Sequence, residues 1–216
     1  MPADVELNFE QLTLHDGNLN DVGGKLDLIV ERAGQLSKEY GWDGLIFPGA
    51  PREVLNPELF PRLSLALNIP VATALRSSAA ALRALSAKRA LLLTPFDEML
   101  NGLIKQFLEN LGIATVSPLK TLRHYTDALS LSPADVAALT QNAFRQQDVV
   151  DAIYFQGAVL DPLEVMETLE NELKVPIVAS NAAMVWFMLS RLGLNNRIVG
   201  YGKLLSSWPM LPDGEG

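Results

Sequence analysis

The sequence predicts an α/β fold built from two similar halves, because one unit of strand, turn, helix and strand occurs twice. In the first copy a short apolar run ends in a turn at Gly49, and in the second copy a similar run ends at Gly157. The two glycines lie 108 residues apart, and Pro70 and Pro176, which precede the next apolar run in each copy, lie 106 apart. This period indicates two pseudo-symmetric halves, each a short, mostly parallel sheet flanked by helices. We expect the two glycine turns to face each other across a central cleft.

In the first half, hydrophobic periodicity predicts the elements. Residues 5–14 alternate roughly between apolar and polar side chains, which predicts a strand, and apolar residues at helical spacing predict a helix over 25–40. The other elements expected in this half are, in order, a strand at 44–47, a loop with three prolines at 51–61, a helix over 63–67, a strand at 71–74 and an Ala/Leu-rich helix over 77–86.

In the second half, local signals mark the ends of several elements. Pro95 follows the strand expected at 89–93 and blocks its extension, because proline cannot donate to a strand ladder. Ser132, with a proline after it, is typical of a helix start and predicts the helix over 136–146. The remaining expected elements are helices over 99–111, 162–173 and 182–192, strands at 113–116, 152–155 and 177–179, an extended segment at 198–205 and a loose tail from Pro209.

The first half lacks an opening strand and helix. In the second half, the unit 89–111 precedes the strand 113–116, whereas nothing precedes the corresponding strand expected at 5–14. The uncovered edge or apolar face that results predicts self-association, so we expect a homo-oligomer. The expected division of the chain is a first half of residues 1–86 and 194–216, a second half of residues 87–193, and a cleft between them.

Composition excludes several classes of function. The chain has 216 residues, 49% of them hydrophobic, and a net charge of −8 without a Lys/Arg block, so we expect no nucleic-acid partner. It has no cysteine, which excludes disulfides, thiolate metal sites and thiol catalysis. The two histidines, His15 and His124, give no metal signature, and we expect neither a metal nor a cofactor. The absence of a long apolar run or a signal-peptide pattern predicts a cytoplasmic protein without a membrane partner.

The order and spacing of several short segments carry a family resemblance. These segments are 43–47, 81–85, 92–96, Asn101, 151–153, 176–181 and 192–194. Together they resemble the aspartate/glutamate racemase superfamily over nearly the whole chain. The closer branch is that of the maleate cis–trans isomerases and arylmalonate decarboxylases.

The resemblance implies a site for a small carboxylic acid between the two halves. In the family, a cysteine at the end of a strand in each half serves as acid, base or nucleophile. Those two positions fall on Gly49 and Gly157, and glycine carries neither a proton nor a nucleophile. The family's hydroxyl donors fall on Ala50 and Pro51, and Phe96 stands where a tyrosine is common. The resemblance therefore implies that thiol catalysis has been lost, and we nominate no catalytic residue.

Backbone groups at the second turn could still hold an anion. The N–H groups of Gly157 and Ala158 lie in a glycine turn, which can bind a carboxylate, and Asn181 follows a strand where it could bind one as well. Both glycines could instead be ordinary turn residues, and Asn181 could cap the helix that follows. The expected ligand-binding residues are Gly49, Ala50, Phe96, Gly157, Ala158 and Asn181.

Other polar residues have two interpretations each. Asp97 and Glu98 could supply a general base at the cleft, although charge at a helix N-terminus explains them better, and the same holds for Asp161 and Glu164. His124 could be an acid/base group, although a surface position is favoured. Trp208 and the two residues after it could pack on a partner.

Two functions follow from these observations. The favoured one is a descendant without thiol catalysis that binds a small carboxylic acid in the cleft. The alternative is an active isomerase, racemase or decarboxylase that acts on a small carboxylic acid without cysteine.

Overall fold

Two parallel sheets, each with helices packed on it, make up the structure, a computed structural model that describes residues 4–12, 22–118, 122 and 125–213. The smaller sheet pairs β1 (Leu45–Phe47) with β2 (Val71–Thr73). The larger sheet has the order β4-β3-β5-β6, from β3 (Arg89–Leu93), β4 (Ala114–Val116), β5 (Ala152–Phe155) and β6 (Ile177–Ala179). All neighbouring strands run parallel, so the expected α/β class with parallel sheets is confirmed.

Helices connect the parallel strands, because such strands need long crossover connections. The α-helices are α1 (Leu26–Tyr40), α2 (Ala50–Val54), α3 (Leu59–Leu67), α4 (Ala74–Ala84), α5 (Glu98–Asn110), α6 (Pro133–Arg145), α7 (Met166–Leu173), α8 (Ser180–Arg191) and α9 (Gly202–Ser207). A 3₁₀ helix spans Tyr125–Ser130. None of the helices in the described ranges is long and apolar enough to cross a membrane.

The internal repeat appears in the structure as two matching βαβα units. β1 and β5 each lead into a glycine with positive φ, and β2 and β6 each lead directly into a long helix, α4 or α8. Even the strand register corresponds, since Phe47 pairs with Thr73 and Phe155 pairs with Ala179. Within the described residues, β1 pairs only with β2, whereas β5 has a neighbour on both sides.

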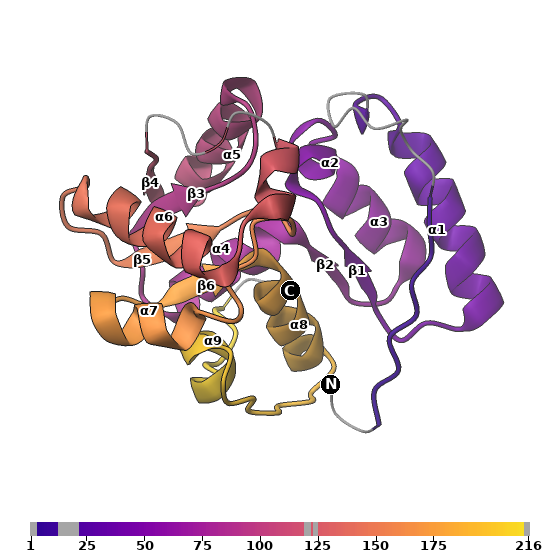
Figure 1. The fold of residues 1–216 in the computed structure, drawn as a ribbon. Coiled ribbons are helices and arrows are strands. Elements are labelled where there is room, and N and C mark those ends of the chain that lie inside the picture. The colour runs from indigo at the N-terminus through magenta and orange to yellow at the C-terminus, as the bar shows by residue number, and fades with distance from the viewer. Residues whose placement is uncertain (1–3, 13–21, 119–121, 123–124, 214–216) are drawn as a thin grey trace.

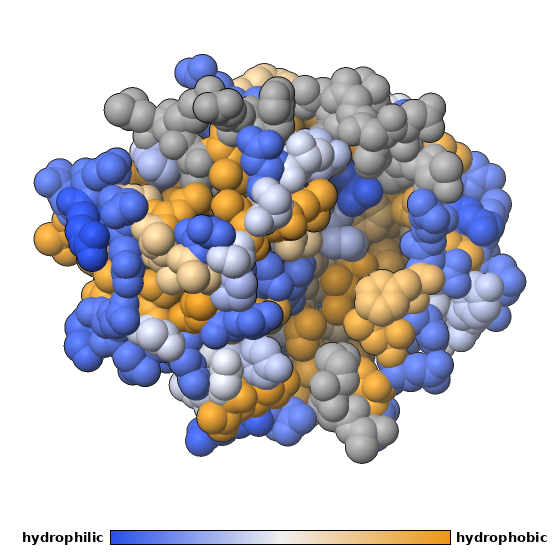
Figure 2. Space-filling view, in the orientation of Figure 1, coloured by the Kyte–Doolittle hydropathy of each residue, from blue (hydrophilic) through white to orange (hydrophobic). Residues whose placement is uncertain are grey.

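Helices α4 and α8 pack against each other and form the layer between the two sheets. Each of them contacts strands of both sheets: α4 contacts β2 and β6, and α8 contacts β1, β2 and β6. On the face shown in Figure 2, the surface is hollowed between the two halves, and apolar residues gather in and around the hollow. The two strand–glycine turns therefore belong to different sheets, and the same pair of helices packs against both of these sheets.

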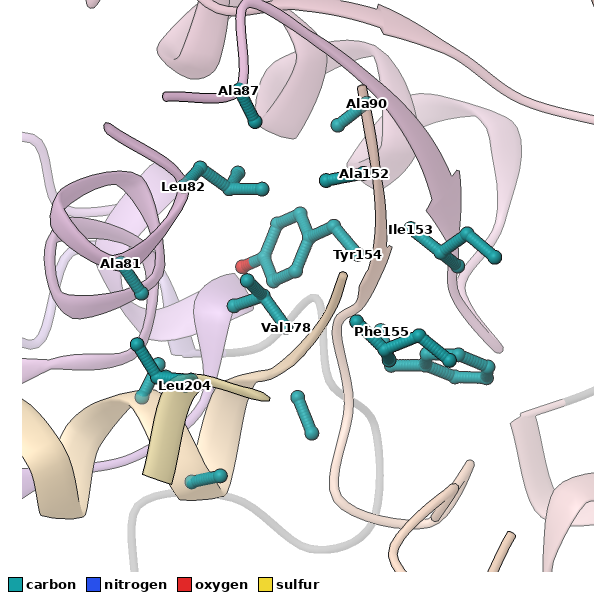
Figure 3. Packing of buried hydrophobic residues seen from close by; sticks show 14 of the residues in the cluster. Ala81, Leu82, Ala87, Ala90, Ala152, Ile153, Tyr154, Phe155, Val178 and Leu204 are labelled. Carbon is teal, nitrogen blue, oxygen red and sulfur yellow. The ribbon is translucent and has the colours of Figure 1, made fainter. Parts of the chain in front are cut away.

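The main hydrophobic core surrounds the larger sheet and the α4–α8 layer. Its largest fully buried side chains include Trp186, Tyr154 and Phe155. Figure 3 shows the Tyr154 ring pointing from β5 toward Leu82 of α4, while Phe155 points away from that helix, as the alternation of side chains along a strand requires. A smaller core joins α1 and α3 to the smaller sheet through Ile29, Ala33, Phe47, Leu59, Leu63 and Val71.

Several sequence-based element predictions are wrong. The strand expected at 5–14 is absent, because residues 5–12 are irregular and residues 13–14 lie outside the described residues; Val5 and Leu12 pack on the cores, but Phe9 is 85% exposed. The loop expected at 51–61 contains α2 and the start of α3, since prolines are tolerated in the first turn of a helix.

Two further elements near the C-terminus differ from expectation. The extended segment expected at 198–205 contains α9 instead, and the helix expected over 162–173 begins only at Met166. Glu167 and Glu170 of α7 hold the start of α9 and the segment before it, because their carboxylates accept hydrogen bonds from the N–H groups of Gly200 (3.1 Å) and Lys203 (2.7 Å). These contacts join residues that are distant in sequence, so local periodicity did not reveal them.

Candidate functional site

A cavity of about 270 Å³ lies between the two glycine turns. Gly49 and Gly157 both line it, as the pseudo-symmetric arrangement of the two halves requires. The remaining described residues of the wall are Val22, Pro48, Pro51, Arg52, Phe96, Tyr125, Gln156, Ala158, Val159, Ser180, Asn181 and Met184. The cavity therefore receives residues from both halves of the repeat.

Both turns have a backbone conformation that favours glycine. At both, other atoms of the chain also fill the space where the Cβ of a side chain would lie. Gly49 has φ 97° and Gly157 has φ 114°, which L residues rarely adopt. A Cβ on Gly157 would lie 2.8 Å from Cδ of Pro95 and 3.3 Å from Cζ of Phe96, both from the segment after β3. A Cβ on Gly49 would lie 2.6 Å from Nη1 of Arg52. The space where a side chain would begin is thus occupied at both turns, by Pro95 and Phe96 at Gly157 and by the Arg52 guanidinium at Gly49.

Arg52 is a partly buried cation on the wall of this cavity. It lies in the middle of the short helix α2, and its Nη1 donates a hydrogen bond to the carbonyl oxygen of Pro48 (3.0 Å), which holds the guanidinium across the Gly49 turn. Its Nε is buried and has no hydrogen-bond partner, and no acidic side chain of the described residues forms an ion pair with it. Burial lowers the pKa of Arg52, but arginine remains protonated in proteins. The cavity therefore contains a positive charge that no carboxylate of the described chain neutralises.

The rest of the described cavity wall carries no charge. Its other polar side chains are neutral, namely Tyr125, Gln156, Ser180 and Asn181. None of the described wall residues is an aspartate, glutamate, lysine or histidine. The described wall thus offers hydrogen-bond donors and one cation, but no group with the usual properties of a general base near neutral pH.

Buried hydrogen bonds fix two segments of the wall. The Tyr154 hydroxyl donates to Oε1 of Gln156, which leaves the amide NH₂ of Gln156 as the group available to a ligand. Burial raises the pKa of Tyr154, so the hydroxyl stays protonated as a donor. After β3, the Thr94 hydroxyl donates to Oδ1 of Asn101, whose Nδ2 donates to the carbonyl oxygen of Phe96 (3.0 Å). Asn101 therefore positions Phe96 in the wall.

Most of the expected ligand-binding residues line the cavity. Gly49, Phe96, Gly157, Ala158 and Asn181 do so, whereas Ala50 is fully buried at the start of α2 and is not part of the wall. The alternative in which Asn181 caps a helix is wrong, because Ala179 occupies the N-cap of α8 and Asn181 lies inside the helix.

None of the acidic residues that were considered as bases, Asp97, Glu98, Asp161 and Glu164, lines the cavity, although Asp161 lines a small adjoining pocket that shares Gly157, Ala158, Ser180 and Asn181 with the cavity wall. The Asp97 carboxylate caps α5 by accepting a hydrogen bond from the N–H of Leu100 (2.9 Å), and Asp161 accepts one from the N–H of Leu163 (3.0 Å). Neither lines the cavity, whereas His15 and His124 lie outside the described residues. Trp208 belongs to the main core, where its indole N–H donates to Ser190 and Asn195, whereas Met210 is 89% exposed. The packing of this segment on a partner therefore stays a prediction, and Trp208 itself is occupied within the chain.

Arg52 is the functional candidate that the sequence did not reveal. It follows Gly49 by a few residues, within the segment expected to be a proline-containing loop. Had this segment been interpreted as the first turn of a helix after the glycine turn, Arg52 would have been placed beside the site. Among the described residues, no cluster of histidine, aspartate or glutamate is arranged to hold a metal ion.

Comparison with known proteins places this chain in a family. The model of the arylmalonate decarboxylase family matches residues 51–205. In structure, the chain is similar to arylmalonate decarboxylase, with a TM-score of 0.74, 23% identity and coverage of 84% of this chain and 82% of that chain.

The chain is also similar to two maleate isomerases. For the enzyme Iso from Pseudomonas putida S16, the TM-score is 0.69 at 21% identity, covering 88% of this chain and 81% of that chain. For the maleate cis–trans isomerase of Nocardia farcinica bound to TRIS, it is 0.71 at 19% identity, covering 90% and 82%. No match is found among curated proteins. The match over residues 51–205, supported by the shared fold, shows that this chain belongs to the arylmalonate decarboxylase family.

Proposed function

We propose that the cavity between Gly49 and Gly157 binds a small carboxylic acid, and that this chain lacks the thiol chemistry of its relatives. The observation that carries the proposal is the partly buried Arg52 guanidinium, which lines the cavity without an ion-pair partner among the described residues. A buried charge without a partner is costly, and a carboxylate is the natural acceptor for a guanidinium.

The absence of cysteine supports the second part of the proposal. A mutant of the Nocardia farcinica isomerase carries a covalently bound succinylcysteine intermediate, so the reaction intermediate in that relative is bonded to a cysteine. This chain has no cysteine and cannot form such an adduct. The described cavity wall also offers no carboxylate or imidazole that would replace the thiol. A binding role without thiol catalysis is the simplest function consistent with this wall.

A ligand-dependent thermal shift tests the binding. A ligand at 100 times its Kd stabilises the folded state by about 2.7 kcal/mol, which for a chain of this size corresponds to about 5–10 °C in Tm. We expect at least one acid from a panel of maleate, phenylmalonate, phenylacetate, aspartate and glutamate to produce such a shift. The shift should disappear in an Arg52→Met variant and persist in Arg62→Met, which removes an exposed cation of α3 that is paired with Asp27.

The same panel separates binding from catalysis. Each acid is incubated with the protein and followed by NMR for decarboxylation, isomerisation or racemisation. Turnover would support the alternative of an active, cysteine-independent enzyme. A panel that gives neither turnover nor a thermal shift would contradict the proposal itself.

We also expect the chain to self-associate. Support comes from the open edge of β1, which in the described residues pairs only with β2. Sedimentation velocity at several concentrations tests this expectation, and a monomer at all of them would contradict it.

A further inference from the structure

In the first half, the N-terminus of α4 holds a carboxylate that belongs to the chain itself. Glu53 of α2 is only 4% exposed. Its Oε1 accepts a hydrogen bond from the Thr73 hydroxyl (2.8 Å), and its Oε2 accepts one from the N–H of Leu75 (3.0 Å). The first N–H groups of a helix have no acceptor within the helix and carry the positive end of its dipole, so they favour an anion. The fold thus shows one place that is shaped to hold a carboxylate.

The second half repeats this place at the start of α8. The strand register makes Ala179 the counterpart of Thr73, and these residues are the N-caps of α8 and α4. Asn181 then corresponds to Leu75. Within the described ranges, no residue accepts a hydrogen bond from the N–H of Asn181, and no side chain caps α8. The start of α8 therefore presents the same kind of N–H donor, without an acceptor from the described chain.

The counterpart of Glu53 does not reach the start of α8. It is Asp161, 108 residues further along the chain, which is shorter by one methylene group. Its side chain is exposed, and its Oδ1 accepts a hydrogen bond from the N–H of Leu163 (3.0 Å). A small pocket of about 10 Å³ is lined by Asp161 and by the first two residues of α8, and it has room for about one water-sized group.

The Ser180 hydroxyl gives an independent indication of a ligand at this place. Ser180 is 5% exposed and lines both the small pocket and the cavity. Its hydroxyl forms no hydrogen bond with another described residue. Because buried hydroxyl groups are normally hydrogen-bonded, an acceptor that enters the cavity would satisfy it. Gln156, which is 1% exposed, adds its amide NH₂ to the same wall.

We propose that the start of α8 binds one carboxylate through the N–H of Asn181 and the hydroxyl of Ser180, in the way that the start of α4 binds Glu53. This inference rests on the proposed function for the class of ligand, and it adds a contact that is separate from Arg52. In the first half, Nε of Arg76 also lies 3.7 Å from Oε1 of Glu53.

The position that corresponds to Arg76 is Ala182. The start of α8 therefore lacks a cation at that position, and we expect it to release its carboxylate readily. The charge of Asp161 opposes an anion here only weakly, because its carboxylate is exposed and is screened by water and salt.

An NMR titration of the full chain with sodium acetate tests the inference. In ¹H–¹⁵N spectra, acetate should shift the amide signals of Ser180 and Asn181 until they saturate, and sodium chloride at the same ionic strength should not. Ser180→Ala should weaken acetate binding, measured at Asn181, by about tenfold. The matched control is Ser77→Ala, which removes a fully buried hydroxyl of α4 that is not part of the described cavity wall and should leave acetate binding unchanged.

An Arg52→Met variant separates this contact from the one at the first turn. The acetate-dependent shifts of Ser180 and Asn181 should persist in that variant. If they disappear, Arg52 alone holds the carboxylate, and the inference is overturned while the proposed function stands. If the two signals respond but no acid of the wider panel gives a thermal shift that depends on Arg52, the inference stands and the proposed role of Arg52 fails.

The parent chain alone is sufficient to refute the inference. It is overturned if acetate leaves the amide signals of Ser180 and Asn181 unchanged, or if chloride shifts them equally. It is also overturned if a folded Ser180→Ala variant binds acetate as tightly as the parent chain does. Circular dichroism and Tm establish that each variant is folded.

Discussion

Adding a single methyl group at Gly157 should test how closely the segment after β3 packs against this turn. In Gly157→Ala, the new Cβ would lie 2.8 Å from Cδ and 3.0 Å from Cγ of Pro95, whose ring cannot rotate away because it is part of the backbone. The residue would also have to adopt φ 114°. Backbone strain of this kind costs about 1–3 kcal/mol. Overpacking a filled space costs about another 1–3 kcal/mol. We therefore expect Gly157→Ala to destabilise the fold by about 2–6 kcal/mol.

Two control variants separate strain from crowding. Gly112 also has positive φ, 78°, but a Cβ there would have no neighbour within 4 Å, so Gly112→Ala should cost only about 1–2 kcal/mol. Pro95→Ala removes the two crowding ring atoms, so adding Gly157→Ala to that background should cost about 1–3 kcal/mol, the strain alone. Such a double-mutant cycle isolates the pairwise contact.

Urea denaturation of the four variants and the parent chain measures these differences. The reasoning is refuted if Gly157→Ala costs no more than Gly112→Ala, or if its cost is unchanged in the Pro95→Ala background. The same crowding implies that Gly157→Cys alone cannot restore a thiol in a relaxed position. Failure of that variant to regain activity would therefore say little about the rest of the cavity.

The remaining predictions concern stability. Trp208→Ala should cost about 3–5 kcal/mol, because the indole is 9% exposed and belongs to the main core; a change in Tm of less than about 3 °C would contradict this placement. Burial raises the pKa of the Glu53 carboxyl, so the folded protein binds this proton more tightly than the unfolded chain does. The contribution of Glu53 to the stability of the fold therefore decreases as the pH rises from the ordinary pKa of 4.5 through the raised pKa of the folded state. Urea midpoints between pH 4 and 9 should fall less steeply in Glu53→Gln than in the parent chain, and identical slopes would count against this. The N–H groups of Lys88 and Arg89 lower the pKa of Asp151, whose contribution is complete above its ordinary pKa of 3.8 and is lost as pH falls through the folded pKa. Asp151→Asn should therefore flatten the acid limb of the same profile, and an unchanged acid limb would show that these bonds do not stabilise the fold.

Buried strands were the elements that the sequence predicted best. Both β3 and β5 have the expected bounds, 89–93 and 152–155, because each is a short apolar run that is buried along most of its length. The prediction of a strand at 5–14 was wrong because alternating apolar and polar residues form a strand only where a partner strand is present. In the described part of the chain, no strand pairs with residues 5–12. Periodicity reports which residues can be buried, whereas pairing depends on neighbours that are distant in sequence.

The sequence predicted that the two glycine turns share a cavity, but not which groups lie against them. The repeat placed Gly49 and Gly157 on one cavity, since symmetry-related turns must face each other. The groups that lie where a side chain of residue 49 or 157 would begin could not be inferred in this way. Pro95 reaches Gly157 from the end of a different strand, and Arg52 reaches Gly49 through a hydrogen bond to Pro48. Such contacts depend on the positions of side chains in the folded protein, and the hydrophobic periodicity of the sequence does not indicate them.

The alanine-rich layer between the two sheets bears on how a ligand enters and leaves. Ala79, Ala80 and Ala81 of α4 and Ala183 of α8 are fully buried in a layer where the two helices pack against each other and against both sheets. A large apolar interface of this kind opposes the hinge motions expected between loosely joined domains. We therefore expect the two sheets to keep their spacing, so that the cavity does not widen and narrow by a movement of one half against the other. Ligand exchange would then depend on local movements of side chains and turns at the cavity mouth, which occur much faster than domain motions.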